Sequence, residues 1–242
     1  MKIAILGGTG SIGKGFALRW GQKHDIIVGS RSEERAEEKA VEYKEILKEY
    51  GFNDASIVGM DNQSAAAEAD VVLLAIRYEQ IGSIIDVIKP VLDNQIVVSV
   101  VVPMTKDRCY INPEATPLKV DATSREDYNA AYFCYTVPPS GSAAQEIAEL
   151  LPEGVELVSA FQNVPADKLA NLDIELDYDI GVSGNSTYSK NVVFDLARDI
   201  PTMRPLDIGP IEASAMIESL TPLVINIAIR NKMKDVGIKF VA

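Results

Sequence analysis

A glycine-rich turn near the amino terminus is the first feature of the sequence that could do chemistry. Gly8, Gly10 and Gly13 match the pattern G-x-G-x-x-G, and they follow the apolar run Lys2–Leu6. The first glycine of this pattern permits a tight turn, the second lets the backbone approach a pyrophosphate, and the third lets a helix pack on a strand. Backbone N–H groups at the start of that helix would face the anion. The pattern predicts a dinucleotide site, and the alternative is a tight turn that binds nothing.

Basic residues after the second expected strand indicate which dinucleotide would bind. An NAD site needs an Asp or Glu about 20 residues after the turn, to hold the ribose 2′-hydroxyl. Here Ser30 and Arg31 occupy that place, and Arg35 follows one helical turn later on the same face. A guanidinium can form two hydrogen bonds to a phosphate, so we expect NADP rather than NAD. The alternative is that both arginines are exposed and pair with Glu34 and Glu38.

Other kinds of catalytic group are scarce in the sequence. The single histidine, His24, is expected at the surface, and one histidine without neighbouring cysteines cannot hold a metal. Cys109 and Cys134 form neither a CxxC pair nor a zinc-ligand pattern. We therefore expect no metal site and no Ser-His-Asp set.

Strands and helices alternate along most of the chain, which predicts a Rossmann-type α/β fold with a doubly wound parallel sheet. Apolar runs of strand length are separated by amphipathic stretches of helix length. The expected strands are 2–6, 26–29, 55–60, 71–76, 96–102, 155–161, 179–183 and 204–208, and the expected helices are 11–22, 33–50, 65–69, 80–92, 143–151, 189–198 and 211–231. We expect an NADP-binding domain at 1–166 and a smaller, mainly helical carboxyl-terminal domain at 167–242.

The charge and the apolar runs bear on partners and location. Lys and Arg number 23 against 35 Asp and Glu, and the net charge of -12 would repel a nucleic acid. The opening apolar run is too short for a signal sequence. The late apolar run 223–229 is shorter than the roughly 20 residues that span a bilayer. We expect a cytoplasmic protein without a nucleic-acid or membrane partner.

The last expected helix is apolar on more than one side, which bears on assembly. Its large apolar residues are Met216, Leu220, Leu223, Val224, Ile227 and Ile229. A helix that is apolar on two sides needs two packing partners. We therefore expect a homodimer or a higher homo-oligomer, and the alternative is burial of both sides within one chain.

Several short segments recur together in one known family. They are Gly7–Gly10, Ser30–Arg31 with Arg35, Val164–Ala166, Ala170–Asp173, Arg204–Pro210, Glu218–Leu223 and Gly237–Phe240. Through them the chain resembles, over nearly its whole length, the archaeal coenzyme F420-dependent NADP oxidoreductases. The resemblance implies reversible hydride transfer between C5 of reduced coenzyme F420, an 8-hydroxy-5-deazaflavin, and C4 of the NADP nicotinamide. Such a transfer depends on the positioning of two rings, so no catalytic side chain is expected.

The resemblance also assigns site residues. It places the NADP pyrophosphate at Thr9, Gly10, Ser11 and Ile12, within the turn of Gly8 and Gly13. The 2′-phosphate would lie at Ser30, Arg31 and Arg35. The rest of the cofactor would lie beside Tyr78, Gly82 and Ala166. Val164, Pro165 and Ala166 would form an apolar platform under the deazaflavin, and Val236 would close the cavity. The alternative for Val164–Ala166 is a strand-to-helix connection without a ligand. Arg77 and Gln162–Asn163 depart from the family pattern, so the nicotinamide surroundings are expected to differ in detail.

A long segment, residues 104–139, breaks the alternation of strands and helices. It contains Pro113, Pro117, Pro138 and Pro139, and long proline-containing loops in compact domains are often functional. One hypothesis is a lid over the deazaflavin or its anionic tail, using Lys106, Arg108 or Lys119. An oligomer contact and a plain surface loop are the alternatives.

Two rival functions share the amino-terminal fold. One is an NADPH-dependent reductase of a small imine, acid or metal, similar to pyrroline-5-carboxylate reductase or to the metalloreductases. The other is a non-enzymatic NADPH sensor. Reduction of such a substrate without a deazaflavin would favour the first, and NADPH binding without oxidation by any acceptor would favour the second.

Overall fold

One eight-stranded sheet forms the centre of the molecule. The structure is a computed structural model that describes residues 1–106 and 133–241. The strands lie in the order β10-β9-β8-β5-β4-β1-β2-β3, and every neighbouring pair is parallel except β8 with β9. Their bounds are β1 Lys2–Leu6, β2 Asp25–Ser30, β3 Ile57–Asp61, β4 Val71–Leu74, β5 Ile96–Ser99, β8 Glu156–Ser159, β9 Asp179–Gly184 and β10 Arg204–Gly209. The predicted Rossmann-type fold class is confirmed.

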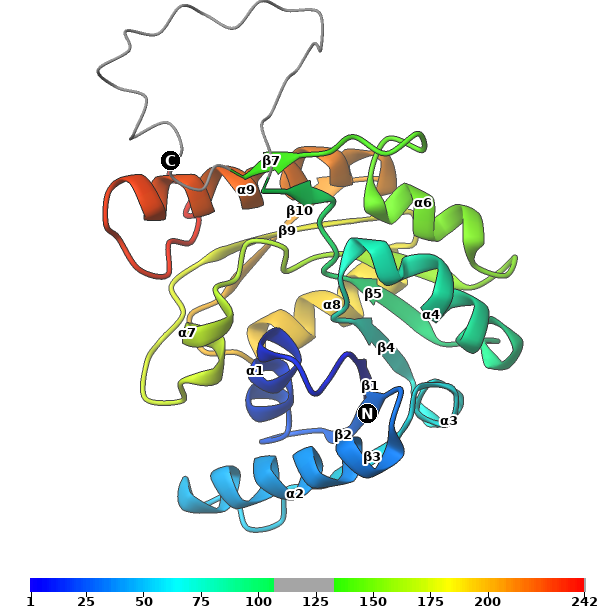
Figure 1. Cartoon of the computed structure of the whole chain (residues 1–242). Coiled ribbons are helices and arrows are strands. Elements are labelled where there is room, and N and C mark those ends of the chain that lie inside the picture. Colours follow the sequence, from blue (N-terminus) through cyan, green and yellow to red (C-terminus); the bar gives the residue numbers. More distant parts are fainter. Residues whose placement is uncertain (107–132, 242) are drawn as a thin grey trace, which may run out of the picture.

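Helices cover both faces of this sheet (Figure 1). They are α1 Ser11–Trp20, α2 Glu33–Glu49, α3 Asn62–Glu68, α4 Ile81–Ile88, α6 Ala143–Leu150, α7 Ala166–Ala170, α8 Thr187–Arg198 and α9 Ser214–Arg230, with short 3-10 turns at Tyr78–Gln80, Lys89–Val91 and Ile211–Ala213. Side chains alternate along a strand, so Ile3 and Ile5 of β1 enter one core while Ala4 and Leu6 enter the other. This double burial explains why the central strands are continuously apolar.

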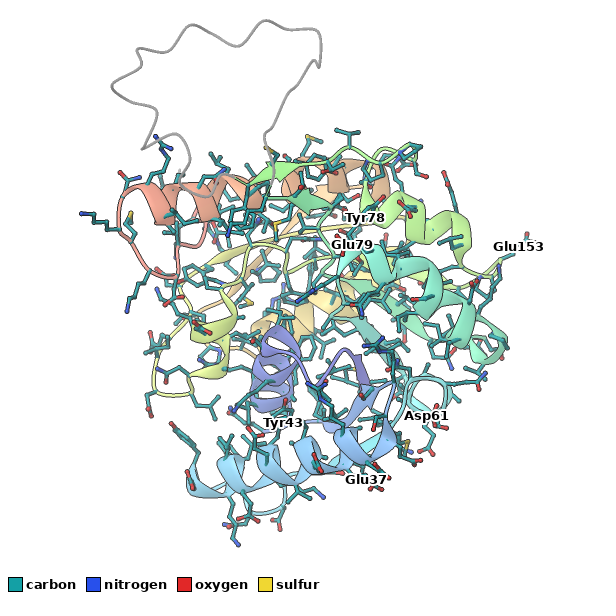
Figure 2. All side chains as sticks on the ribbon, in the orientation of Figure 1. Glu37, Tyr43, Asp61, Tyr78, Glu79 and Glu153 are labelled. Atoms are coloured by element: carbon teal, nitrogen blue, oxygen red, sulfur yellow. The ribbon has the colours of Figure 1, made fainter. Side chains whose placement is uncertain are left out.

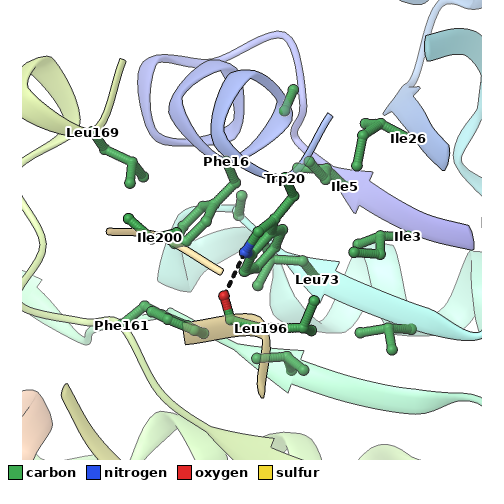
Figure 3. Close-up of a cluster of buried hydrophobic side chains, with 14 of the residues drawn as sticks. Ile3, Ile5, Phe16, Trp20, Ile26, Leu73, Phe161, Leu169, Leu196 and Ile200 are labelled. Carbon is green, nitrogen blue, oxygen red and sulfur yellow. Dashed lines mark hydrogen bonds between the residues drawn. The ribbon is translucent and has the colours of Figure 1, made fainter. Parts of the chain in front are cut away.

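An aromatic cluster fills the core on the α1 side (Figure 3). The rings of Phe16 and Trp20 stack with centroids 4.5 Å apart, and Phe161 meets Phe16 edge-on at 5.1 Å. The indole N–H of Trp20 donates to the Leu196 carbonyl at 2.9 Å. Helix α1 is therefore tied to α8, although the two helices are far apart in the sequence.

The carboxyl-terminal part continues the same sheet. Strands β9 and β10 were expected from the sequence, and they lie beside β8 at the edge opposite β3. Helices α8 and α9 belong to this part, and α9 lies along one end of the molecule (Figure 1). The division into domains at residues 166 and 167 stays a prediction.

A short antiparallel pair stands at the ends of the long proline-containing segment. Strand β6, Met104–Thr105, pairs with β7, Cys134–Tyr135. Lys106 is exposed just after β6. Arg108 and Lys119 lie outside the described residues, so the lid hypothesis for this segment stays a prediction.

Helix α9 is unusually apolar. Together with the preceding 3-10 turn it spans Ile211–Arg230, which by length and composition alone would suffice to cross a membrane, and half of that stretch is buried inside the protein. The expectation of no membrane partner therefore stays a prediction.

Candidate functional site

The elements that carry the predicted NADP residues meet at one edge of the sheet. Strand β1 lies between β2 and β4, and all three are parallel. The segments that follow their carboxyl ends are the glycine turn, the Ser30–Arg31 pair and the Tyr78–Gly82 stretch. Ligands of open α/β sheets bind at this edge. The topology thus brings three separate sequence features to one place.

The glycine turn has a geometry that requires its glycines. Gly7 has a φ of 81°, and the Gly10 N–H donates to the Gly7 carbonyl at 2.9 Å. A Cβ on Gly13 would lie 2.6 Å from the Gly7 oxygen, so only glycine allows α1 to start this close to the turn. The Tyr43 hydroxyl donates to the Gly8 carbonyl at 3.0 Å, which holds the turn against α2 (Figure 2).

The start of α1 is open to an anion. Gly10 is the N-cap and offers no side-chain cap, no acidic residue stands in the first turn, and Ser11 is exposed. The first N–H groups of a helix have no partner within the helix, and the helix dipole favours a negative charge there. This turn therefore has the donors and the polarity that a pyrophosphate requires.

Two free guanidinium groups lie beside this turn. The Gly8 N–H donates to the Gly29 carbonyl at 3.2 Å, which joins the turn to the end of β2. Arg31 and Arg35 are exposed there, and within the described residues neither forms an ion pair, so the expected alternative of pairing with Glu34 and Glu38 is not observed. Two unpaired cations beside a helix amino terminus suit a phosphate dianion.

Tyr78 and Gly82 both follow β4, but Tyr78 is partly buried and hydrogen-bonded, whereas Gly82 is exposed. The Tyr78 hydroxyl donates to Glu146 of α6 at 2.6 Å, and burial, with help from Glu146, raises the pKa of Tyr78 to about 12. Gly82 is exposed in α4, and a Cβ added there would meet no atom within 4 Å. The protein itself therefore does not require a glycine at this position, which leaves room for a ligand to approach the backbone.

A cavity of about 420 Å³ joins the glycine turn to the carboxyl-terminal part. Its lining residues are Ser11, Gln162, Asn163, Val164, Pro165, Ala166, Asp167, Thr221, Val224, Ile225, Ala228, Ile229, Asp235 and Val236. The structure thus places Ser11, Val164–Ala166 and Val236 around one space, while their roles toward the two cofactors stay a prediction. A neighbouring cavity of about 340 Å³ shares Ser11, Ala166 and Asp167 and adds Lys14, Ala170 and Asn171. The remaining predicted residues lie outside both linings.

Phe161, which precedes the platform residues Val164–Ala166, has a backbone conformation that is unusual for a residue other than glycine. Phe161 has a φ of 69° although it is not glycine, and the aromatic contacts with Phe16 and Trp20 hold it in place. After it, the Gln162 amide N–H donates to the Ser99 carbonyl at 3.3 Å, and the Asn163 amide donates to the Thr221 hydroxyl at 2.9 Å. The two residues that depart from the family pattern therefore fasten the platform to β5 and α9.

Arg19 holds the carboxyl end of α7, the helix that begins at the platform residue Ala166. It is 5% exposed, and its guanidinium donates to the carbonyls of Leu169, Asn171 and Ile174 at 3.0, 2.5 and 2.9 Å. Burial lowers the pKa of Arg19. Gly15 lies against Leu169 so closely that a Cβ would be 2.7 Å from the leucine side chain. These contacts set the spacing between α1 and α7, and hence the width of the space between Ser11 and Ala166.

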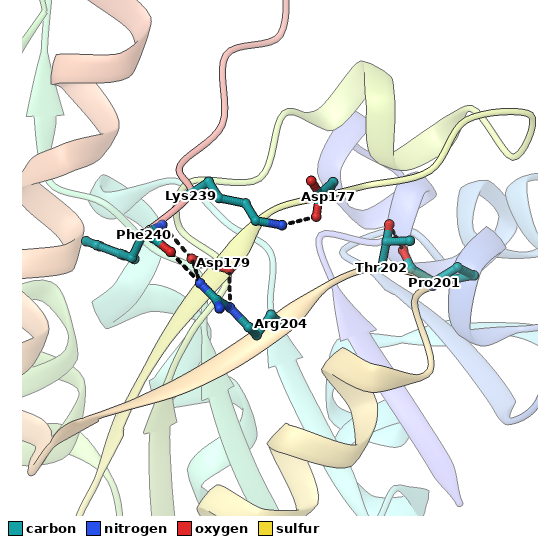
Figure 4. A network of polar contacts seen from close by, with 7 residues as sticks. All are labelled: Asp177, Asp179, Pro201, Thr202, Arg204, Lys239 and Phe240. Carbon is teal, nitrogen blue, oxygen red and sulfur yellow. Dashed lines mark hydrogen bonds and ion pairs between the residues drawn. The ribbon is translucent and has the colours of Figure 1, made fainter. Parts of the chain in front are cut away.

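The segment that carries Val236 is also fixed (Figure 4). Arg204 donates to both carboxylate oxygens of Asp179 at 2.7 and 2.6 Å and to the Phe240 carbonyl at 2.5 Å, while the Phe240 N–H donates to Asp179 at 2.6 Å. Lys239 pairs with Asp177. The hydrogen bonds from Arg204 lower the pKa of Asp179. The chain end is thereby held against β9 and β10.

Sequence reasoning missed the contribution of α9 to the cavity. Thr221, Val224, Ile225 and Ala228 line it; their helical spacing places them on one side of α9, but the other side is apolar as well, so the spacing does not show which side faces the cavity. Val224 and Ile229 also line the cavity, and Val224 is only 8% exposed. One apolar side of α9 is therefore packed within its own chain, and the expected homo-oligomer stays a prediction.

Glu218 is the fully buried carboxyl of α9. It accepts hydrogen bonds from the Ala143 and Ala144 N–H groups at 3.0 and 3.1 Å and from the Tyr135 hydroxyl at 3.0 Å. Burial raises the pKa of Glu218 to about 7, although these hydrogen bonds oppose the shift. Glu218 does not line the cavity, so its contacts join α9 to α6 and β7.

Comparison with known proteins gives consistent results. The family described as NADP oxidoreductase, coenzyme F420-dependent, matches residues 2–103. A protein named F420-dependent NADP reductase from Methanocaldococcus jannaschii is 43% identical over 239 residues, which cover 99% of this chain and 97% of that protein. Its namesake from Methanothermobacter thermautotrophicus is 32% identical over 241 residues, covering 99% and 94%. A solved structure from Arthrobacter sp. FB24, provisionally described as an F420-dependent NADP reductase, has a TM-score of 0.73 at 20% identity and covers 100% of both chains, which shows the shared fold.

Proposed function

This chain belongs to the coenzyme F420-dependent NADP oxidoreductase family, and we propose that it transfers a hydride reversibly between reduced coenzyme F420 and NADP. The observation that carries this proposal is the cavity that has Ser11 of the phosphate turn on one side and Val164–Ala166 on the other. A dinucleotide anchored at the turn would extend its nicotinamide into this cavity. A second flat ring on the platform would then lie against it.

The NADP site is built by the carboxyl edge of the sheet. Gly8, Thr9, Gly10, Ser11, Ile12 and Gly13 surround the pyrophosphate, and Ser30, Arg31 and Arg35 bind the 2′-phosphate. Tyr78 and Gly82 lie along the cofactor, and Ala166 approaches the nicotinamide. The unpaired guanidinium groups and the uncapped helix start support these assignments.

Val164, Pro165 and Val236 hold the deazaflavin, with the walls of the cavity excluding water from the reacting face. Reduced coenzyme F420 would supply the hydride from C5 and oxidised NADP would accept it at C4, while the reduced deazaflavin also releases one proton to solvent, so that atoms and charge balance. The protein contributes orientation, since a direct transfer between two rings needs no nucleophile or metal. Arg19 and Phe161 act on the reaction only by positioning the platform relative to α1.

The direct test follows both substrates at once. Purified protein is mixed with NADP and reduced coenzyme F420, and the absorbance bands of the oxidised deazaflavin and of NADPH are recorded together. The two products should form at equal molar rates, and neither band should rise when NAD replaces NADP or when a flavin replaces the deazaflavin. A chain that oxidises NADPH with a small imine or a metal ion, but with no deazaflavin, would support the reductase rival. NADPH binding without turnover by any acceptor would support the sensor.

We also propose a homodimer formed through the outer side of α9. Met216, Leu223 and Ile227 follow helical spacing and are 67%, 50% and 37% exposed, while the opposite side of the helix lines the cavity. A contiguous exposed apolar face favours association.

A cytoplasmic location follows from the proposed substrates, which are charged molecules of the cell interior. The net charge of -12 supports the absence of a nucleic-acid partner.

A further inference from the structure

A basic turn, defined as residues 230–234, lies at the edge of the cavity. Ile229 before it and Asp235 after it both line the cavity. The turn carries Arg230, Lys232 and Lys234, all of them exposed. Among the described residues none of these three side chains has an ion-pair partner. They form a compact positive group in a chain whose net charge is -12.

The backbone of this turn is held in place while its cationic side chains are free. The Met233 N–H donates to the Ala228 carbonyl at 2.9 Å, and the Tyr178 hydroxyl donates to the Asp235 carbonyl at 3.1 Å. Lys232 has a φ of 54°, directly after the helix end at Asn231, where glycine is the usual residue. A lysine therefore occupies a position whose backbone conformation does not favour it.

The charge changes sign between the cavity and its edge. The charged groups of the cavity lining are the carboxylates Asp167 and Asp235, and most other lining residues are apolar. An anionic group inside this space would meet negative charge and apolar walls. At the edge it would meet three cations instead. A ligand with an uncharged ring and a negative tail is the kind of molecule that this arrangement suits.

We propose that the basic turn binds the anionic tail of the deazaflavin substrate while its ring lies in the cavity. This inference rests on the proposed function, and it assigns Arg230, Lys232 and Lys234 to substrate affinity. Guanidinium and ammonium groups form charge-assisted hydrogen bonds with phosphate and carboxylate oxygens. In Figure 1 the turn, in red, lies on the same side of the molecule as α7, which begins at the platform residue Ala166.

The test compares two deazaflavins that share a ring. Coenzyme F420 carries the tail, and an 8-hydroxy-5-deazaflavin that ends at its ribityl chain lacks it. The KM of each is measured with NADPH for the wild type, for the variant Arg230→Gln, Lys232→Gln, Lys234→Gln, and for a control with Lys44, Lys48 and Lys89 changed to Gln. The control removes the same charge from exposed positions away from the cavity lining.

We expect the turn variant to raise the KM for coenzyme F420 about tenfold, as the loss of three exposed ion pairs should. The KM values for the tail-free deazaflavin and for NADPH should stay unchanged, and the control should behave as the wild type. In the wild type, added salt should raise the KM for coenzyme F420 but not the KM for the tail-free deazaflavin. Equal effects on both deazaflavins, or no effect and no salt dependence, would overturn the inference. Absence of turnover with both deazaflavins would instead overturn the proposed function.

Discussion

At the scale of single residues, Arg31 decides between the two dinucleotides. We expect Arg31→Ala to weaken NADP binding by about 1.5–3 kcal/mol, because a charge-assisted pair to the 2′-phosphate is lost. NAD, which lacks that phosphate, should bind nearly as before. Dissociation constants for both dinucleotides, measured by calorimetry, check this. Lys48→Ala at the far end of α2 removes the same charge and should change neither dissociation constant. Equal losses of affinity for NADP and NAD in Arg31→Ala would refute the proposed 2′-phosphate site.

Gly82 is expected to matter for NADP binding and not for the stability of the protein. Nothing in the protein lies within 4 Å of a Cβ at this position, so Gly82→Ala should stabilise α4 by about 0.5 kcal/mol. The added methyl should nevertheless weaken NADP binding several-fold, because the cofactor would approach the backbone there. Urea unfolding and NADP titration measure the two effects. Val87→Ala, five residues later in α4, should leave the NADP affinity unchanged. An unchanged NADP affinity in Gly82→Ala would remove Gly82 from the site.

At the scale of elements, Glu218 makes the joining of α9 to α6 depend on pH. Its folded-state pKa of about 7 lies above the ordinary value of 4.5, so the stability that the protonated carboxyl contributes is complete below pH 4.5. That contribution is lost as the pH rises to about 7, and its full size is on the order of 3 kcal/mol.

We therefore expect the wild type to lose stability between pH 4.5 and 7 and Glu218→Gln to lose much less. The fluorescence of Trp20, the single tryptophan and fully buried, follows urea unfolding at each pH. The exposed Glu153 provides the control, since Glu153→Gln should keep the wild-type pH dependence (Figure 2). A pH dependence that persists in full in Glu218→Gln would show that another group causes it.

At the scale of the whole molecule, the two apolar sides of α9 have different partners. One side closes the cavity, and the exposed side with Met216, Leu223 and Ile227 is free for a second chain. Light scattering should therefore give twice the chain mass of 26.3 kDa for the wild type. Leu223→Glu should give the monomer mass, because a charge would be buried in the contact. Val41→Glu, on the exposed side of α2, should remain dimeric, and a wild-type mass near 26.3 kDa would exclude the dimer.

The sequence by itself determined those features that depend on neighbouring residues. The glycine turn, the Ser30–Arg31 pair and most strands and helices follow from local backbone preferences and from the period of apolar residues, and the structure reproduces them. Tertiary structure alone decided which side of α9 faces the cavity, since both sides are apolar and periodicity cannot rank them. Tertiary structure also decided the left-handed backbone conformation of Phe161 and the placement of Ser11 and Ala166 in the lining of one cavity. Both features depend on packing between segments about 150 residues apart in the sequence.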